Sequence, residues 1–156
     1  MEDSLAFWRG YFRTGKKSPR KYDMTNLIPA AGRGKRFADA GYALPKPLIP
    51  VDGEPMLVQS VNALPQPTKW IFVCLENHIK AGLGESIRKE FPKAVIVPVK
   101  DVTQGMLNTC MLAEKSLDKK KPLLISACDY DVQNDISAFD RLVKDKTIDV
   151  VIWTFR

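Results

Sequence analysis

Cysteine and histidine are scarce in this chain of 156 residues. The 3 cysteines are an odd number and lie far apart, and two of them fall within apolar runs, which is typical of reduced thiols that act as small hydrophobic side chains. The single histidine, His78, follows an apolar run, where we expect it to cap a helix or face solvent rather than to catalyse a reaction. No serine or cysteine has a neighbouring base to activate it, so a covalent enzyme intermediate is not indicated.

Long apolar runs are absent as well. No stretch approaches the roughly 18 consecutive apolar residues of a membrane span, and the N-terminus lacks the apolar core and cleavage site of a signal peptide. The composition, with 45% hydrophobic and 27% charged residues, is that of an ordinary globular domain. A chain of this length buries roughly 68 to 70% of its unfolded surface, so it forms a core without disulfides. We therefore expect a cytoplasmic protein without a membrane span.

Positive charge is concentrated near the N-terminus. Residues 1–24 contain six basic and three acidic residues, which accounts for half of the net charge of +6. As a helix this segment would place its aromatic residues on one face, which favours docking onto an additional domain or another subunit of a homo-oligomer over binding to a membrane surface. We predict a basic, aromatic leader over residues 1–24 and a core over residues 25–156. We predict no nucleic-acid partner, since a phosphorylated small molecule or solubility explains such charge equally well.

Short apolar runs alternate with segments of helical spacing along the rest of the chain. The runs are unbroken rather than alternating in polarity, which predicts strands that are buried on both faces. Their alternation with helices predicts a three-layer α/β fold, in which a mostly parallel, doubly wound sheet carries helices on both faces. The expected strands are residues 26–31, 70–75, 94–99, 123–128 and 149–155, and the expected helices are residues 56–64, 79–91, 102–117 and 136–143.

The first expected strand leads directly into a basic turn that contains Gly32 and Gly34. Ligands of doubly wound sheets bind at the carboxyl ends of strands, so this turn is a candidate site. Glycines let backbone N–H groups approach an anion, and Arg36 can offer a bidentate fork to phosphate. Two familiar phosphate loops do not fit, because Lys35 is followed by Arg36 rather than by Ser or Thr, and Phe37 stands where a dinucleotide fingerprint needs glycine.

Two linked motifs, LIPAAGRGKRF and PKPLIPVDGEPML, resemble the N-terminal signature of the sugar-phosphate nucleotidylyltransferases. These enzymes join a nucleoside triphosphate to a sugar 1-phosphate or a related phosphate and release pyrophosphate. The family pattern is an apolar strand, then Ala-Ala-Gly-x-Gly-x-Arg, and later Pro-Lys-Pro-Leu. The matching positions are Ala30, Ala31, Gly32, Gly34, Arg36, Pro45, Lys46, Pro47 and Leu48. The resemblance covers residues 26–155 and implies a Rossmann-like nucleotidyltransferase fold that is incomplete at its C-terminal end.

The resemblance implies a role for each part of the two motifs. Arg36 would contact the departing β and γ phosphates, and Lys46 would reach the transferred α-phosphate and the incoming phosphate oxygen. The prolines on both sides of Lys46 support its role independently, because they restrict the backbone and give the side chain a fixed starting direction. The alternative is an ordinary surface lysine in a proline-rich loop. The backbone that would hold the base and the triphosphate comprises Ala30, Ala31, Gly32, Arg33 and Gly34.

Two later segments add candidate residues. In TQGMLNTCMLAEK, residues 103–115, the resemblance implies that Gln104 reads the base through its amide and that Gly105 lets the ring approach the backbone. A polar helix cap is an equally good interpretation of this segment. In SACDYDV, residues 126–132, Asp129 follows a strand and is the hard oxygen ligand that Mg²⁺ prefers, with Asp131 as the second choice. The alternative is a pair of loop carboxylates without a special role.

The predicted function is transfer of a nucleoside monophosphate from an NTP to a sugar 1-phosphate or similar phosphorylated acceptor. A phosphate acceptor is already ionised near neutral pH, so alignment and charge neutralisation by Lys46, Arg36 and a magnesium ion on Asp129 would supply the catalysis. Two alternatives stay open. An Asp-x-Asp after a strand also resembles the metal motif of nucleotide-sugar glycosyltransferases, and a chain without the later part of the domain would suit a non-catalytic nucleotide-binding module.

Overall fold

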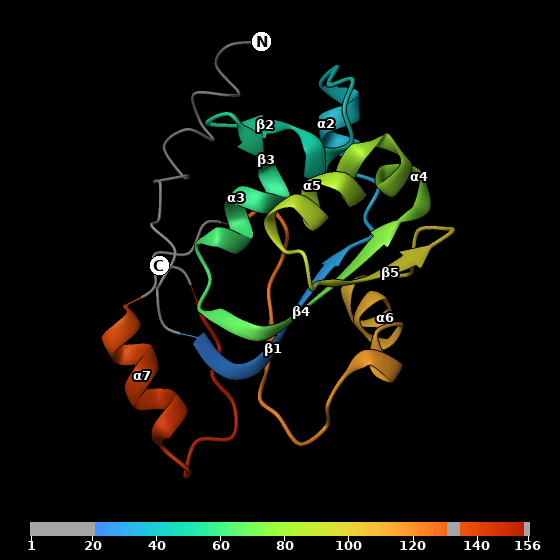
Figure 1. Cartoon of the computed structure of the whole chain (residues 1–156). Helices are drawn as coiled ribbons and strands as arrows, with labels where there is room; N and C mark the ends of the chain where they lie inside the picture. The colour runs from blue at the N-terminus through green and yellow to red at the C-terminus, as the bar shows by residue number, and fades with distance from the viewer. Residues whose placement is uncertain (1–20, 131–134, 155–156) are drawn as a thin grey trace.

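A parallel sheet of four strands forms the centre of the fold (Figure 1). The computed structural model describes residues 21–130 and 135–154. All three strand pairings are parallel, as the unbroken apolar runs predicted. In the order in which they lie side by side, the strands are β5 (Val95–Val99), β4 (Gln66–Leu75), β1 (Lys21–Ala30) and β6 (Leu123–Ile125).

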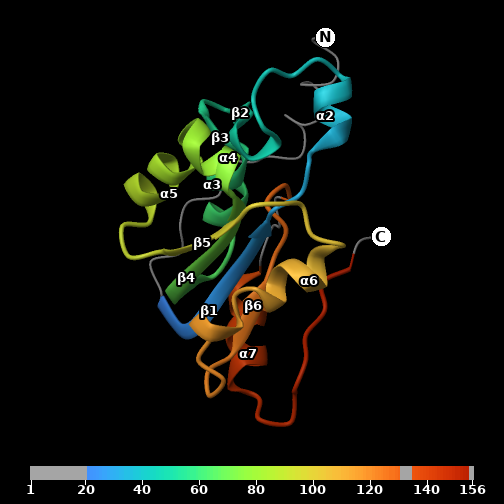
Figure 2. The same ribbon diagram turned by 90° about the vertical axis from the view of Figure 1, so that its right-hand side faces the viewer.

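Helices cover both faces of this sheet, which confirms the predicted three-layer α/β fold (Figure 2). The longer ones are α3 (Met56–Asn62), α5 (Gly84–Glu90), α6 (Met106–Met111) and α7 (Ile136–Lys144). α3 and α5 lie on one face and α6 lies on the other. The shorter elements are α2 (Lys35–Asp39), the 3-10 helices η1 (Lys46–Leu48) and η3 (Glu114–Ser116), β2 (Pro50–Val51), β3 (Glu54–Pro55), α4 (Glu76–His78) and the π-helical turn η2 (Ile79–Leu83).

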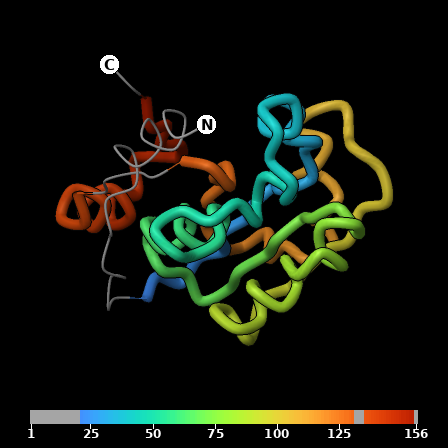
Figure 3. Tube along the Cα trace, turned by 90° about the horizontal axis from the view of Figure 1, so that it is seen from above, coloured from blue at the N-terminus to red at the C-terminus, as the bar shows by residue number. Residues whose placement is uncertain are grey.

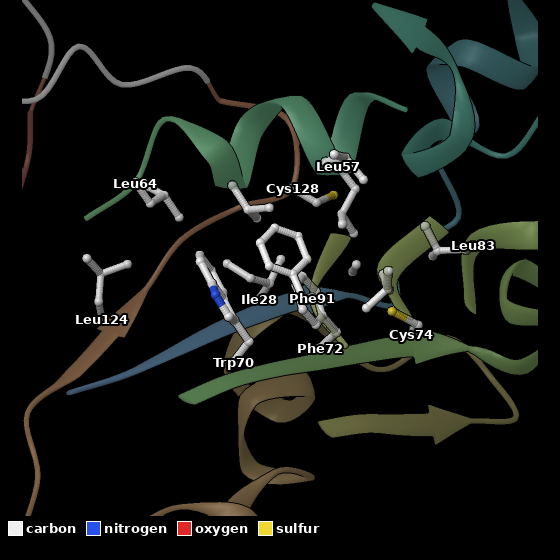
Figure 4. Close-up of a cluster of buried hydrophobic side chains, with 14 of the residues drawn as sticks. Ile28, Leu57, Leu64, Trp70, Phe72, Cys74, Leu83, Phe91, Leu124 and Cys128 are labelled. Carbon is white, nitrogen blue, oxygen red and sulfur yellow. The ribbon is translucent and has the colours of Figure 1, made fainter. Parts of the chain in front are cut away.

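Aromatic side chains fill the layer between the sheet and α3. Trp70 and Phe72 project from β4 toward Phe91, with ring centroids 4.9 Å apart for Trp70 and Phe91 and 5.6 Å apart for Phe72 and Phe91. Figure 4 shows these rings below α3, with Leu57 on the helix side of the same cluster. Burial of this much apolar surface fixes α3 firmly against the strands, since it is the main favourable term in folding.

The structure departs from the expected elements in several places, since β6 stops at Ile125 rather than at residue 128 and two segments adopt another structure. Residues 149–154 form no strand, and Val150 and Ile152 are 74% and 78% exposed. Apolar composition indicated burial there, but a strand also needs a hydrogen-bonding neighbour, and none of the described residues pairs with this segment. The expected helix over residues 102–117 is instead a loop followed by α6 and η3, because Gly105 has a φ of 127° and ends the loop in a conformation outside the helical region.

The first strand is longer than expected. β1 begins at Lys21, so it includes four residues that the sequence assigned to the leader, and Tyr22 and Met24 are buried in the core. Residues 1–20 of the predicted leader lie outside the described residues. Tyr22 donates a hydrogen bond to Asp140 of α7 at 2.8 Å, which places α7 beside the amino end of β1. α7 therefore lies at the opposite end of the molecule from α2, as Figure 3 shows.

The order of the strands reverses at β1. The chain runs from β1 to β4 and β5 toward one edge of the sheet, and then returns to place β6 on the other side of β1. Such a reversal opens a crevice beyond the carboxyl ends of the two strands that flank it. In this fold those ends lead into residues 31–34 and residues 126–129, which contain candidate residues from the sequence.

Candidate active site

A cavity of about 260 Å³ occupies the crevice at the carboxyl ends of β1 and β6. Four segments that are distant in the sequence line it. They are residues 29–34 after β1, Lys46 with Pro47, the loop and first turns of α6 from Val102 to Thr109, and residues 127–129 after β6. The fold thus brings the glycine turn, the lysine of the second motif and the predicted metal ligand to one cavity.

The glycine turn touches the lysine. Gly34 has a φ of 62°, the left-handed region that favours glycine, and its carbonyl accepts the N–H of Phe37 at 2.9 Å at the start of α2. A Cβ added to Gly34 would lie 2.8 Å from the Cβ of Lys46, closer than two such carbons approach in proteins. Glycine is therefore required at this position for two reasons, the backbone conformation and the contact with Lys46.

Lys46 is held by the short helix that its own motif forms. Leu48 N–H donates to the Pro45 carbonyl at 2.8 Å, and Ile49 N–H donates to the Lys46 carbonyl at 3.2 Å. The side-chain amine forms an ion pair with Asp129 Oδ2 and lies 5.5 Å from the centre of the Phe37 ring, a distance compatible with a cation–π contact. The side chains of the pair are 21% and 19% exposed, so water only partly screens their attraction.

Asp129 meets the requirements of a magnesium ligand that acts together with a substrate. Among the described residues no group of three or more His, Cys, Asp and Glu side chains gathers into a metal site. Mg²⁺ is commonly held by one or two carboxylates plus the phosphates of a substrate, so a single aspartate facing the cavity fits that ion. The two carboxylate oxygens can serve Lys46 and a cation together. Asp131, the second candidate, lies outside the described residues.

The predicted arginines face different cavities. Arg36 lines a second cavity of about 420 Å³, together with Phe37 and Tyr42, and this cavity shares Gly34, Lys46 and Asp129 with the first. The Lys46–Asp129 pair thus borders both spaces. Arg33 lines a third cavity, near the ends of β4 and β5, and does not line the other two. The main chain of its neighbours Gly32 and Gly34, rather than the Arg33 side chain, faces the first cavity.

The part of the cavity lining that comes from the loop before α6 and from α6 itself differs from the sequence prediction. Gly105 lines the first cavity as expected, but Gln104 is exposed and does not line it. Thr103 and Thr109, which the sequence analysis did not select, line the cavity instead. Their hydroxyl oxygens contact each other, and each lies 3.1 Å from the Gly105 carbonyl oxygen. In the TQGMLNT segment Thr103 stands two residues before Gly105 and Thr109 four residues after it. The first turn of α6, which follows Gly105, brings Thr109 back toward the Gly105 carbonyl, and this i to i+4 spacing was the only signal in the sequence.

The buried thiols near the site are unreactive as nucleophiles. Burial raises the pKa of Cys74 to about 12, and burial raises the pKa of Cys128 to about 11 with a further contribution from the neighbouring Asp129. Cys128 lines the first cavity, and both thiols belong to the hydrophobic cluster between the sheet and α3 (Figure 4). Both thiols are protonated near neutral pH, so neither supplies a thiolate to attack a substrate.

His78 is buried, with an exposed fraction of 5%, so the expectation of a solvent-facing histidine was wrong. It ends α4, directly after the apolar strand β4, and its Nδ1 has no hydrogen-bond partner among the described residues. Burial lowers the pKa of His78 from its ordinary value of 6.5, because desolvation disfavours the charged imidazolium. The neutral form is therefore the one that the fold accommodates.

Because of His78, the free energy of unfolding is expected to decrease as the pH is lowered below about 6.5. Just below pH 6.5 the unfolded chain binds more protons at this histidine than the folded protein does, because burial lowers the pKa of the folded form. The stability contributed by neutral His78 is therefore complete above pH 6.5 and is lost as the pH falls through the lowered pKa. His78 is the sole histidine of the sequence. In His78→Phe the urea midpoint should decline less than in the parent between about pH 7 and pH 5. Equal declines in the two proteins would contradict this assignment.

Comparison with known proteins agrees with the fold and the motifs. The family model of the MobA-like NTP transferase domain matches residues 26–151. A comparison with curated protein sequences found no significant match. Among solved structures, the nucleoside-diphosphate-sugar pyrophosphorylase from Vibrio cholerae RC9 is similar with a TM-score of 0.55 and 22% identity, over 73% of this chain and 52% of that one.

Two further structures share the fold. The inositol-1-phosphate CTP transferase from T. maritima gives a TM-score of 0.53 and 20% identity, over 75% of this chain and 45% of that one. A UDP-glucose pyrophosphorylase complexed with UDP-glucose gives 0.51 and 17%, over 79% of this chain and 55% of that one. The chain spans about half the length of these proteins. Within the described residues no helix has the length and apolar character that crossing a membrane requires.

Proposed function

The chain belongs to the family of MobA-like NTP transferase domains, and from that premise we propose that it transfers a nucleoside monophosphate from an NTP to a sugar 1-phosphate or similar phosphorylated acceptor. The observation that carries the proposal is the meeting of three groups at one cavity. Gly34 of the phosphate-binding turn lies against Lys46, and Lys46 is paired with Asp129, although these residues come from three separate segments. A polyphosphate seated on the turn would have its α-phosphorus within reach of the lysine amine.

The proposed reaction is an in-line displacement. An oxygen of the acceptor phosphate attacks the α-phosphorus, a new P–O bond forms, and the bond to the β-phosphate oxygen breaks, so that pyrophosphate leaves with that electron pair. No proton needs to be removed from an ionised acceptor. Lys46 would neutralise charge on the α-phosphate, and Arg36, from the second cavity, would receive the β and γ phosphates. Ala30, Ala31, Gly32 and Gly34, which line the first cavity, would hold the nucleotide through their backbone, whereas Arg33 lies outside that lining.

Asp129 is the residue that we propose to hold Mg²⁺. When bound, the ion would supply charge neutralisation to the phosphates and help to orient them. The ion pair with Lys46 holds Asp129 at the border of the two cavities, which supports this proposed role. For the base we propose Gly105 together with Thr103, which lines the cavity, in place of the exposed Gln104.

The class of acceptor and the cellular location of the protein are also proposed here. The related structures are, by their names, an inositol-1-phosphate CTP transferase and pyrophosphorylases of a nucleoside-diphosphate sugar and of UDP-glucose, which supports a phosphorylated sugar or polyol as the acceptor. We propose a cytoplasmic location, where nucleoside triphosphates are available. The family match disfavours the alternative of a nucleotide-sugar glycosyltransferase. A pyrophosphate assay distinguishes the proposed enzyme from a non-catalytic nucleotide-binding module.

Nucleoside triphosphates with magnesium are expected to raise the melting temperature of the chain. A nucleotide at 100 times its Kd adds about 2.7 kcal/mol of apparent stability, which for a chain of this size corresponds to roughly 5 to 10 °C. A screen of CTP, UTP, dTTP, GTP and ATP by thermal shift would identify the base, with the nucleoside monophosphates as controls for the phosphate contacts. A shift produced by nucleotide sugars but by none of the triphosphates would contradict the proposed function.

Pyrophosphate release then separates an enzyme from a binding module. The nucleotide that stabilises the chain is incubated with sugar 1-phosphates and related phosphates, and pyrophosphate is measured with and without each acceptor. Release that depends on the acceptor supports nucleotidyl transfer. Stabilisation by a nucleotide without release for any acceptor would identify a non-catalytic nucleotide-binding module.

A further inference from the structure

The helix α3 connects the two loops that carry Lys46 and Asp129. At the start of the helix, Met56 N–H donates to the Ile49 carbonyl at 2.9 Å. One turn later, Ser60 Oγ lies 3.0 Å from the Cys128 carbonyl oxygen and 2.9 Å from the Met56 carbonyl oxygen. Ser60 is 1% exposed, so no water replaces these contacts.

These contacts act on the backbone immediately beside the ion pair. Ile49 N–H donates to the Lys46 carbonyl at 3.2 Å, so the bond from Met56 fixes the turn that carries the lysine. Cys128 directly precedes Asp129, so the bond from Ser60 fixes the backbone from which the aspartate projects. Lys46 and Asp129 are 83 positions apart in the sequence, and a single turn of α3 holds both of their segments.

The segment before Asp129 needs such support because β6 is short. The strand has three residues at the edge of the sheet, and its contact with β1 ends where Ser126 N–H donates to the Leu27 carbonyl at 3.2 Å. Three peptide units then separate Ser126 from Asp129. Ser60 donates a hydrogen bond to the Cys128 carbonyl within these three peptide units. This bond links the segment to α3, which packs on the aromatic core.

We propose that Ser60 is a positioning residue of the proposed nucleotidyl transfer, since it sets the backbone of Cys128 and thereby aims Asp129 at Lys46. This inference rests on the proposed function only in naming the reaction that it serves. A serine within a helix usually bonds back to the carbonyl four residues earlier. Ser86 in α5 does so, with Oγ 3.1 Å from the Gly82 carbonyl oxygen, and it serves as the matched control. The contact across to Cys128 is what distinguishes Ser60.

The first test measures the ion pair in the resting protein, without any reaction. Lys46 is acylated with limiting acetic anhydride, and the rate at this site is followed by mass spectrometry. Ser60→Ala is expected to raise the rate several-fold, because a less well-aimed Asp129 leaves the amine free more of the time, and Asp129→Asn should raise it at least as much. Ser86→Ala should leave it unchanged. An unchanged rate in Ser60→Ala would overturn the proposal whatever the enzyme activity.

The second test asks whether Ser60 acts through Asp129 during turnover. Ser60→Ala is expected to lower kcat for pyrophosphate release roughly 10-fold, since small displacements of catalytic groups have effects of this order or larger. In the Asp129→Asn background the same change should lower the remaining kcat less than about twofold, because coupled residues are not additive. An equal loss in both backgrounds would show a merely structural role and overturn the proposal.

A third variant covers the case in which alanine leaves a poorly folded protein. Ser60→Cys leaves no cavity, with a somewhat larger side chain, but offers a weaker hydrogen-bond donor, so its acylation rate and kcat should lie between those of the parent and Ser60→Ala. If the parent releases no pyrophosphate with any acceptor, the proposed function fails, while the acylation rates still decide whether Ser60 positions Asp129.

Discussion

Replacing Lys46 by alanine is expected to reduce the rate of pyrophosphate release by roughly 10²- to 10³-fold or more, the range seen when one preorganised donor is removed from a site that stabilises developing charge. Lys46 borders both cavities, its Cβ lies against Gly34 and its amine pairs with Asp129, whereas Lys35 lines the second cavity alone, so among the described residues no other lysine lines the first cavity. Steady-state kinetics with the preferred nucleotide and acceptor would measure the effect.

The fold should survive this substitution. The Lys46–Asp129 pair is partly accessible to water, so an unpaired Asp129 stays hydrated and the melting temperature should change by only a few degrees. Lys119→Ala is the matched control, since Lys119 also pairs with a carboxylate, Glu114 at 2.8 Å, but with both side chains more than half exposed. Its activity should equal that of the parent. Near-normal turnover in Lys46→Ala would sink the proposed mechanism.

Replacing Gly34 by alanine is expected to reduce activity by roughly 10- to 100-fold, because the new methyl group would lie 2.8 Å from the Cβ of Lys46 and must push the lysine or the turn aside. The left-handed backbone adds about 1 to 2 kcal/mol of destabilisation for a residue with a Cβ. The loss of activity and the loss of stability therefore have different causes at this position. Urea denaturation and steady-state kinetics on the same preparation would measure both.

Gly53→Ala separates these two causes. Gly53 lies in the turn between β2 and β3 with a φ of 88°, and a Cβ there would meet no atom within 4 Å. The substitution should lower stability by an amount similar to that of Gly34→Ala and leave activity within about twofold of the parent. If both variants lost activity equally, backbone strain rather than contact with Lys46 would explain the effect, and the proposed link between the turn and the lysine would be wrong.

Much of the fold could be predicted from the sequence, because its main signal is local. The unbroken apolar runs predicted β1, β4, β5 and β6 as parallel strands, and the alternation with helical segments predicted helices on both faces. Burial on both faces was wrong for β6, whose Leu123 and Ile125 are exposed, and holds only in part for β5. The same signal failed over residues 149–154, where apolar composition is present but no neighbouring strand pairs with the segment. Periodicity reports how one element is buried and carries no information about which strand lies beside it.

The sequence by itself determined the pair of motifs, since glycines at fixed spacing and a lysine between two prolines are visible without any fold. The tertiary structure decided which residues meet. In the folded protein Asp129 pairs with Lys46, and Ser60 contacts the carbonyl of Cys128. Arg36 lines the second cavity, and Gln104 is exposed. The physical reason is that these contacts join segments tens of residues apart, and their register follows from the reversal of strand order at β1 and from the packing of α3 on the sheet.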